Sequence, residues 1–207
     1  MRPLARLHAI TDGAVLAAPD LGIRAAAIAA AGPAVALHAR DRAASGAALT
    51  AASRRLLALA RPPEASVFVN ARADIAAALG AQGLQLGSED LTAREARGIF
   101  PRGWIGRSVH TQSEAAEAVD EGADFLLVGN IFETRSHPGR PAAGLDLIRE
   151  AASLGRPVIA IGGIDPARAA RARDAGAYGV AAISALWCAP DAAAAALALL
   201  QPWVDAS

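Results

Sequence analysis

Short apolar runs alternate with longer segments of helical character, and this alternation recurs along the whole chain. The apolar runs are rich in Val, Ile and Leu, which is typical of β-strands, and they cover Leu7–Ile10, Val35–His38, Val67–Val69, Leu84–Leu86, Trp104–Gly106, Phe125–Val128, Val158–Ile161 and Val180–Ile183. The segments between them are rich in Ala, Leu and Arg, which favour helix, and they cover Val15–Ala31, Ala47–Ala60, Arg72–Leu79, Ala93–Ile99, Ser113–Glu121, Leu145–Ser153, Ala167–Ala175 and Asp191–Trp203. The pattern predicts eight strand–helix units.

These units predict an α/β fold with a parallel sheet. Strands that are apolar at nearly every position, such as Val158–Ile161, suit a parallel sheet that is buried on both faces. Helix boundaries carry the expected signals, because Thr92 and Glu95 form a capping-box pattern and Asp165 precedes a proline. With 207 residues and no linker, the chain is expected to form one domain, residues 1–207, as a (β/α)₈ TIM barrel. An open doubly wound sheet is the second possibility.

Composition excludes several classes of protein. Twenty basic and twenty acidic residues leave no net charge, which argues against a nucleic-acid partner. The apolar stretches are too short to span a membrane, and the single cysteine, Cys188, cannot form an intrachain disulfide. These features favour a cytoplasmic protein, with a homo-oligomer as one option for its assembly. The chain contains no lysine, which excludes a Schiff-base aldolase.

In a barrel of this kind the chemistry lies at the carboxyl ends of the strands, where this chain is unusually polar. Gly162 and Gly163 follow the seventh strand, and Ser184 and Ala185 follow the eighth, where such barrels commonly bind phosphate. Glycine lets backbone N–H groups approach an anion closely, and a helix N-terminus favours negative charge. We therefore expect a phosphate site here, although two glycines can also serve only to make a tight turn.

Four histidines are candidates for acid/base chemistry. His110 follows the fifth strand and should face the mouth of the barrel, so it ranks first, with His8 second. His8 and His38 lie within strands, where a histidine can simply be packed, and His137 lies in a long loop. No His-x-x-x-His spacing links any of them, which argues against a histidine metal site.

Charged residues near the strand ends suggest anion and cation sites. Arg40 and Arg135 are candidate clamps for a carboxylate or phosphate, because a guanidinium matches the geometry of both groups. Glu89 and Asp90 could bind Mg²⁺, or they could favour the start of the helix at Ala93 through their negative charge. The two interpretations are equally open.

The chain resembles the superfamily of thiamine-phosphate synthase and the thiazole tautomerase (TenI-type) proteins. The resemblance extends over essentially the whole chain and is carried by residues 7–12, 69–76, 83–91, 106–110, 128–134 and 159–164. Together these motifs are specific, and they imply a small phosphate ester as the substrate.

Departures from the synthase pattern favour the tautomerase branch. The synthase has an Asn-Asp pair after strand three, whose Asp helps to bind Mg²⁺, and this chain has Asn70-Ala71. Two synthase lysines are replaced, by Arg40 and Arg135, whereas the segments ending at His110 and Thr134 resemble the tautomerase. The segment 87–91 alone looks more like the synthase.

The resemblance therefore predicts an isomerase of thiamin biosynthesis that aromatises a carboxythiazole phosphate tautomer without metal or cofactor. One base that later acts as the acid suffices for this proton transfer, and the resemblance assigns that role to His110. The phosphate is expected at Gly162, Gly163, Ser184 and Ala185, and the rest of the substrate at Arg40, Asn70, Ser108, Asn130 and Thr134.

Two other functions stay open. The first is thiamine-phosphate synthase, a transferase that joins an aminopyrimidine diphosphate to a thiazole phosphate and releases pyrophosphate. The second is a barrel that binds a phosphate ligand without catalysis.

Overall fold

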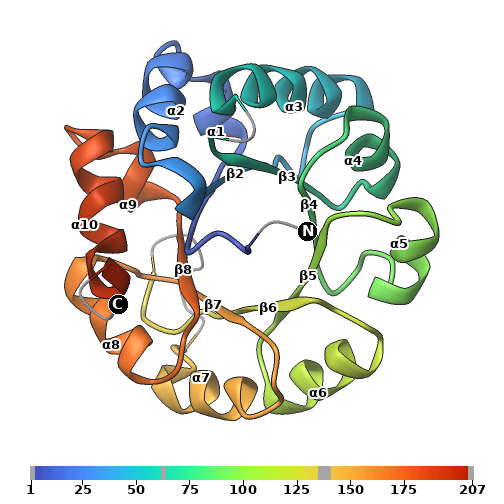
Figure 1. Cartoon of the computed structure of the whole chain (residues 1–207), viewed down its shortest axis with the longest axis vertical. Helices are drawn as coiled ribbons and strands as arrows, with labels where there is room; N and C mark the ends of the chain where they lie inside the picture. The colour runs from blue at the N-terminus through green and yellow to red at the C-terminus, as the bar shows by residue number, and fades with distance from the viewer. Residues whose placement is uncertain (1–2, 62–63, 135–140, 205–207) are drawn as a thin grey trace.

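The structure, a computed structural model, describes residues 3–61, 64–134 and 141–204. Eight parallel strands form a closed barrel in sequence order, with the first strand paired to both the second and the eighth (Figure 1). The strands are β1 (Leu7–Ile10), β2 (Val35–Ala39), β3 (Ser66–Asn70), β4 (Gly83–Leu86), β5 (Trp104–Val109), β6 (Phe125–Val128), β7 (Val158–Ile161) and β8 (Gly179–Ala182). The predicted TIM barrel is confirmed.

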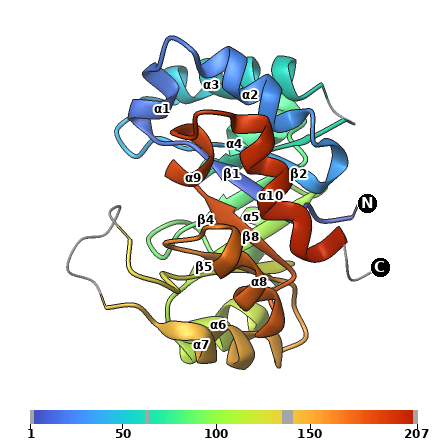
Figure 2. The ribbon, with the colours of Figure 1, turned by 90° about the vertical axis from the view of Figure 1, so that its left-hand side faces the viewer.

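Helices cover the outside of the barrel, as Figures 1 and 2 show. They are α1 (Gly13–Ala17), α2 (Leu21–Ala29), α3 (Gly46–Ala60), α4 (Ala73–Leu79), α5 (Ala93–Ile99), α6 (Gln112–Asp120), α7 (Gly144–Ala152), α8 (Pro166–Asp174), α9 (Ser184–Trp187) and α10 (Ala192–Val204), with a short 3₁₀ helix at Gly32–Ala34. The capping box of Thr92 and Glu95 and the N-cap at Asp165 are both present.

Several predicted boundaries were wrong. The strand predicted to end at Gly106 extends to Val109, so Ser108 lies within β5 rather than after it. The segment Val15–Ala31 is two helices, α1 and α2, because Pro19 holds the preceding Ala18 in an extended conformation (φ −64°, ψ 134°). The eighth strand ends at Ala182, and Ile183 (φ −109°, ψ −85°) turns the chain into the short helix α9.

The interior of the barrel contains an aromatic layer. Phe68 of β3 and Phe125 of β6 are buried inside the barrel and lie edge to face. Glycines make room for them, since a Cβ atom on Gly83 would lie 2.0 Å from Phe68 and one on Gly106 would lie 2.1 Å from Phe125. The segment before β1 lies across the amino-terminal opening of the barrel (Figure 1), where Leu4 is buried. The barrel is therefore covered at its amino-terminal end.

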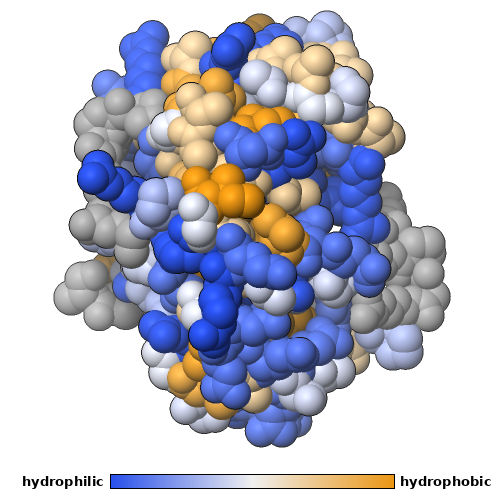
Figure 3. Space-filling model, turned by 90° about the vertical axis from the view of Figure 1, so that its right-hand side faces the viewer, coloured by the Kyte–Doolittle hydropathy of each residue, from blue (hydrophilic) through white to orange (hydrophobic). Residues whose placement is uncertain are grey.

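The outer surface is mainly hydrophilic on the side of the molecule that carries α5 (Figure 3), with a few separate hydrophobic areas. Ile99, at the end of α5, is an exposed apolar side chain, with 47% of its surface accessible. Within the described part of the chain, each helix is too short or too polar to cross a membrane.

Candidate functional site

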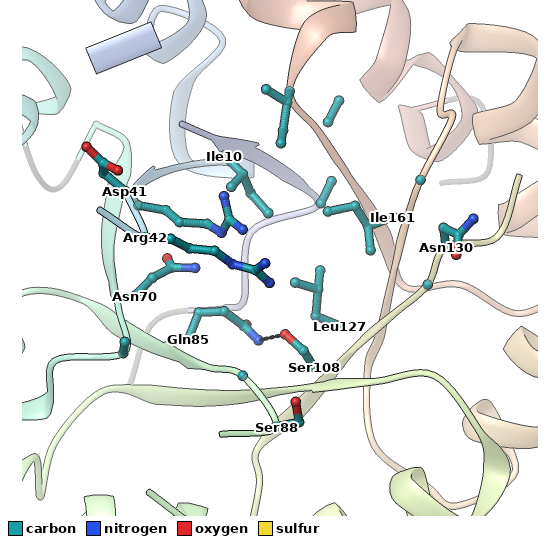
Figure 4. Close-up of a pocket in the computed structure, with 18 of the residues that line it drawn as sticks. Ile10, Asp41, Arg42, Asn70, Gln85, Ser88, Ser108, Leu127, Asn130 and Ile161 are labelled. Atoms are coloured by element: carbon teal, nitrogen blue, oxygen red, sulfur yellow. Dashed lines mark hydrogen bonds between the residues drawn. The ribbon is translucent and has the colours of Figure 1, made fainter. Parts of the chain in front are cut away.

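A cavity of about 620 Å³ lies at the carboxyl ends of the strands (Figure 4). All ten predicted site residues line it: Arg40, Asn70, Ser108, His110, Asn130, Thr134, Gly162, Gly163, Ser184 and Ala185. Arg135 and His137 lie outside the described residues. The structure thus brings the predicted residues to one place, and the chemical role of each stays a prediction.

The glycine side of the cavity is built by the loops after β6, β7 and β8. Gly162 (φ +100°) and Gly163 (φ +62°) both adopt backbone conformations that favour glycine. A Cβ atom on Gly163 would lie 2.4 Å from the carbonyl oxygen of Glu133, so only glycine lets these two loops lie so close together. Ser184 and Ala185 begin α9, where backbone N–H groups have no acceptor within the helix. These groups suit an anion.

The arginine side is formed by the loop after β2. The Thr11 hydroxyl donates to the backbone oxygens of His38 (2.8 Å) and Arg40 (3.0 Å), and it accepts from the Arg40 N–H at 2.9 Å. This fixes the backbone from which Arg40 extends, and the Arg42 side chain reaches over the cavity (Figure 4). Burial, with a smaller contribution from nearby Arg42, lowers the pKa of Arg40, although a guanidinium stays charged at neutral pH.

No carboxylate of the described residues lies within 4.0 Å of the Arg40 or Arg42 guanidinium. By contrast, Arg72, which also lines the cavity, is paired with Asp74. Asp12 and Asp41 attract the Arg40 guanidinium only from beyond that distance, so neither arginine is held in an ion pair and both can bind an anionic ligand.

The histidines separate into two kinds. His110 lines the cavity, and its Nδ1 lies 3.1 Å from a carboxylate oxygen of Glu114, which also accepts the His110 backbone N–H at 2.7 Å. His8, the second-ranked candidate, is fully buried beneath the cavity, and burial lowers its pKa to about 4. His38 is also fully buried, and its Nδ1 lies 3.1 Å from the side chain of Asn70.

Gln85, Arg42 and Arg72 line the cavity but were not among the predicted site residues. Gln85 is buried, and its Nε2 donates to the Ser108 hydroxyl at 3.0 Å (Figure 4). A signal for Gln85 exists in the sequence, because it is a polar residue between two leucines of a buried strand. Arg42 and Arg72 carried no such signal, since loop arginines are usually exposed.

The carboxylates at the cavity give little support for the Mg²⁺ site of the synthase pattern. Ala71 stands where the synthase pattern has its second carboxylate, and Asp90 accepts the Gly87 N–H at 2.7 Å, in the manner of a turn. Within the described residues, no cluster of three or more His, Cys, Asp or Glu side chains is arranged to hold a metal. The residues present do not fit a two-carboxylate Mg²⁺ site.

Comparison with known proteins shows the family of the chain. A model of the thiamine monophosphate synthase family matches residues 7–186. A thiamine-phosphate synthase of Thermus thermophilus is 47% identical over 153 residues, which cover 73% of this chain and 74% of the relative. That of Mycobacterium sp. (strain JLS) is 44% identical over 172 residues, which cover 82% of this chain and 73% of the relative.

Two solved structures have the same barrel fold as this chain. A thiamine phosphate pyrophosphorylase from Pyrococcus furiosus has a TM-score of 0.81 and 32% identity, covering 97% of this chain and 96% of that chain. A 3-hexulose-6-phosphate synthase, at 19% identity and a TM-score of 0.67, shares the fold alone.

These findings contradict the tautomerase prediction. The relatives are named as synthases, so the predicted isomerase activity was wrong, and the transferase alternative fits better. The prediction gave too much weight to the loss of a carboxylate at Ala71 and of a lysine at Arg40. Arginine also binds anions, so the second of these changes does not remove the chemistry. From the match over residues 7–186 and from these relatives, the chain belongs to the thiamine monophosphate synthase family.

Proposed function

We propose that this protein is a cytoplasmic thiamine-phosphate synthase, a transferase that joins an aminopyrimidine diphosphate to a thiazole phosphate and releases pyrophosphate. The observation that carries the proposal is the 47% identity to a thiamine-phosphate synthase over about three quarters of both chains. The cavity supports it, because groups suited to anions project from two separate sets of strand ends, as two phosphorylated substrates require.

The arginines after β2 suit the diphosphate. Release of pyrophosphate builds negative charge on the departing oxygen, and fixed positive groups at that point stabilise the transition state more than the ground state. Arg40 is held by the Thr11 hydrogen bonds, and Arg42 reaches into the same space. Both guanidiniums therefore bind the diphosphate in this proposal.

The glycine side suits the phosphate of the thiazole. The backbone N–H groups near Gly163 and at Ser184 and Ala185 would bind it, with the remaining polar lining, including Ser108 and Asn130, orienting the rings. His110 is held against Glu114 at the wall of this space and is assigned a substrate-contacting role. Because the residues do not fit a two-carboxylate metal site, no step is assigned to a metal.

The test is incubation of the purified protein with aminopyrimidine diphosphate and thiazole phosphate, with and without Mg²⁺. The proposal expects equal amounts of thiamine phosphate and pyrophosphate. Ligand binding without either product would support the phosphate-binding barrel and refute the proposal.

Arginine variants test the assignment of the diphosphate. Arg40→Gln should lower kcat/KM by about 10- to 100-fold, which is the loss expected for one hydrogen bond to a charged group. Arg40→Lys should recover part of it, because the positive charge is kept. The control is Arg149→Gln, an exposed residue of α7 that pairs with Asp146 outside the cavity, and an equal loss in that variant would contradict the assignment.

A further inference from the structure

Two buried histidines beneath the cavity form a hydrogen-bonded chain that the proposed reaction does not use. His8 on β1 and His38 on β2 are both fully buried, and His38 stacks on Phe68 with ring centroids 4.9 Å apart. The carbonyl oxygen of Ala5 lies 3.1 Å from His8 Nε2, and His8 Nδ1 lies 2.8 Å from His38 Nε2. His38 Nδ1 in turn lies 3.1 Å from the amide group of Asn70. The chain thus runs from the covered end of the barrel to the cavity.

Burial keeps both imidazoles neutral at pH 7. Desolvation lowers the pKa of His8 to about 4 and lowers that of His38 well below its usual value. His8 also lowers the pKa of His38 through its charge, and Arg40 does so to a smaller extent. The Ala5 carbonyl raises the pKa of His8, and Asn70, with Oδ1 toward the ring as in the structure, raises that of His38. No carboxylate takes part among the described residues. Each ring therefore has one N–H donor and one acceptor nitrogen.

The direction of the chain is fixed at its covered end. A carbonyl oxygen can only accept, so His8 must have its proton on Nε2 to bond to Ala5. His8 Nδ1 is then an acceptor, and His38 must donate to it from Nε2. His38 Nδ1 is then also an acceptor, and its partner on Asn70 must be a donor. The only donor of an asparagine side chain is its amide nitrogen.

We propose that His8 and His38 are positioning residues that hold the Asn70 amide with Nδ2 toward His38 and Oδ1 toward the cavity. In the structure Oδ1 is 3.1 Å from His38 Nδ1, which would bring two lone pairs together in this tautomer. The two ends of an amide have nearly the same shape, so the hydrogen-bond network decides between them. A 180° rotation of the amide satisfies every member of the chain.

The consequence is an acceptor at the floor of the cavity. Asn70 lines the cavity beside Gln85 (Figure 4), and in the proposed orientation it accepts a hydrogen bond from an N–H or O–H group of a ligand. An amino group on a bound pyrimidine is a group of this kind. This last step rests on the proposed function, whereas the direction of the histidine chain does not.

The decisive experiment is a long-range ¹H–¹⁵N correlation spectrum of the protein labelled with ¹⁵N in histidine, recorded at pH 7. The spectrum distinguishes Nε2–H, Nδ1–H and doubly protonated rings, and the His8→Phe and His38→Phe variants assign the signals. The expected result is a neutral ring with Nε2–H at both positions. An Nδ1–H tautomer or an imidazolium at either position would overturn the proposal, and this measurement needs no substrate.

Asn70→Asp tests the link to the amide. A carboxylate only accepts, so His38 should gain a proton on Nδ1 in this variant, either by changing tautomer or by becoming an imidazolium. The control is Ser108→Ala, because the Ser108 hydroxyl is bonded to Gln85 rather than to either histidine; the His38 signal should not change in it. An unchanged His38 in Asn70→Asp would contradict the proposed contact.

A kinetic comparison separates positioning from mere packing. His38→Phe keeps an aromatic ring against Phe68 but no longer orients Asn70. The KM for aminopyrimidine diphosphate should rise by about 2- to 10-fold, as expected for one neutral hydrogen bond, with kcat nearly unchanged. An unchanged KM in the folded variant would refute the positioning role. A protein with two Nε2–H histidines but no synthase activity would refute the proposed function and leave the histidine chain intact.

Discussion

Replacement of Gly163 by alanine adds one methyl group at the point where the loops after β6 and β7 meet. The new Cβ atom would lie 2.4 Å from the Glu133 carbonyl oxygen and 3.0 Å from Phe132 Cβ. Such distances are shorter than an ordinary van der Waals contact, so the backbone must move. The same backbone is assigned to the phosphate, so the variant should weaken both the fold and the anion site.

A second glycine with the same backbone conformation separates the cost of the close contacts at Gly163 from the cost of the left-handed backbone. Gly80 has φ +63°, against +62° for Gly163, but a Cβ atom on Gly80 would have no neighbour within 4 Å. Gly80→Ala should therefore cost only the left-handed conformation, about 1 kcal/mol in the free energy of unfolding. Gly163→Ala should cost that amount plus overpacking of about 1–3 kcal/mol. Its phosphate affinity should fall about tenfold or more, the value of one charge-assisted hydrogen bond.

Urea denaturation measures the first effect, and calorimetric titration with inorganic phosphate measures the second. Gly80→Ala should bind phosphate as the native protein does, because Gly80 caps α4 and does not line the cavity. Native phosphate affinity in Gly163→Ala, or an equal loss of stability in the two variants, would contradict this prediction.

Two further predictions concern the metal and the buried histidines. Ala71→Asp restores the carboxylate of the synthase pattern at a residue with φ +67°, which Asp tolerates, and it should raise the affinity of the purified protein for Mg²⁺ about tenfold in calorimetric titrations. Ala71→Asn is the neutral control, and equal Mg²⁺ affinities in the two variants would contradict the prediction. The pKa of His8 is about 4 in the folded protein, below the usual 6.5. Between these pH values His8 is protonated only in the unfolded chain, so the folded protein loses stability as the pH falls from 6.5 to 4. The loss should approach about 3 kcal/mol in urea titrations, and the same pH dependence in His8→Phe would refute the assignment.

Most of the fold could be predicted from the sequence because each strand is a short apolar run between helical segments. That pattern indicates strands that are buried on both faces of the sheet, as in a parallel barrel. The error at Val15–Ala31 had a local cause, since the alanine-rich composition favoured helix throughout and concealed the break at Pro19. The short helix α9 was missed because four residues carry no periodic signal.

The clustering of the candidate site residues at one cavity could be predicted for the same reason. In a closed parallel barrel all carboxyl ends of the strands meet at one face, so any polar residue just after a strand is brought there. The direction of a long side chain does not follow from this rule. Arg42 and Arg72 lie in similar loops, yet Arg72 is paired with Asp74 and Arg42 reaches over the cavity.

The function was harder to predict because a chemical role can be filled by more than one residue. This chain has no lysine, so a lysine of the family pattern cannot be present, and its absence says little about anion binding. Arg40 has a positive charge at that position, and two hydrogen bonds through the Thr11 hydroxyl fix the backbone that carries its side chain. The change at Ala71 is different, because alanine supplies neither the oxygen atoms nor the negative charge with which a carboxylate binds a metal ion. The comparison of Mg²⁺ affinity between the native protein and Ala71→Asp is therefore the measurement that shows whether the change at Ala71 altered metal binding.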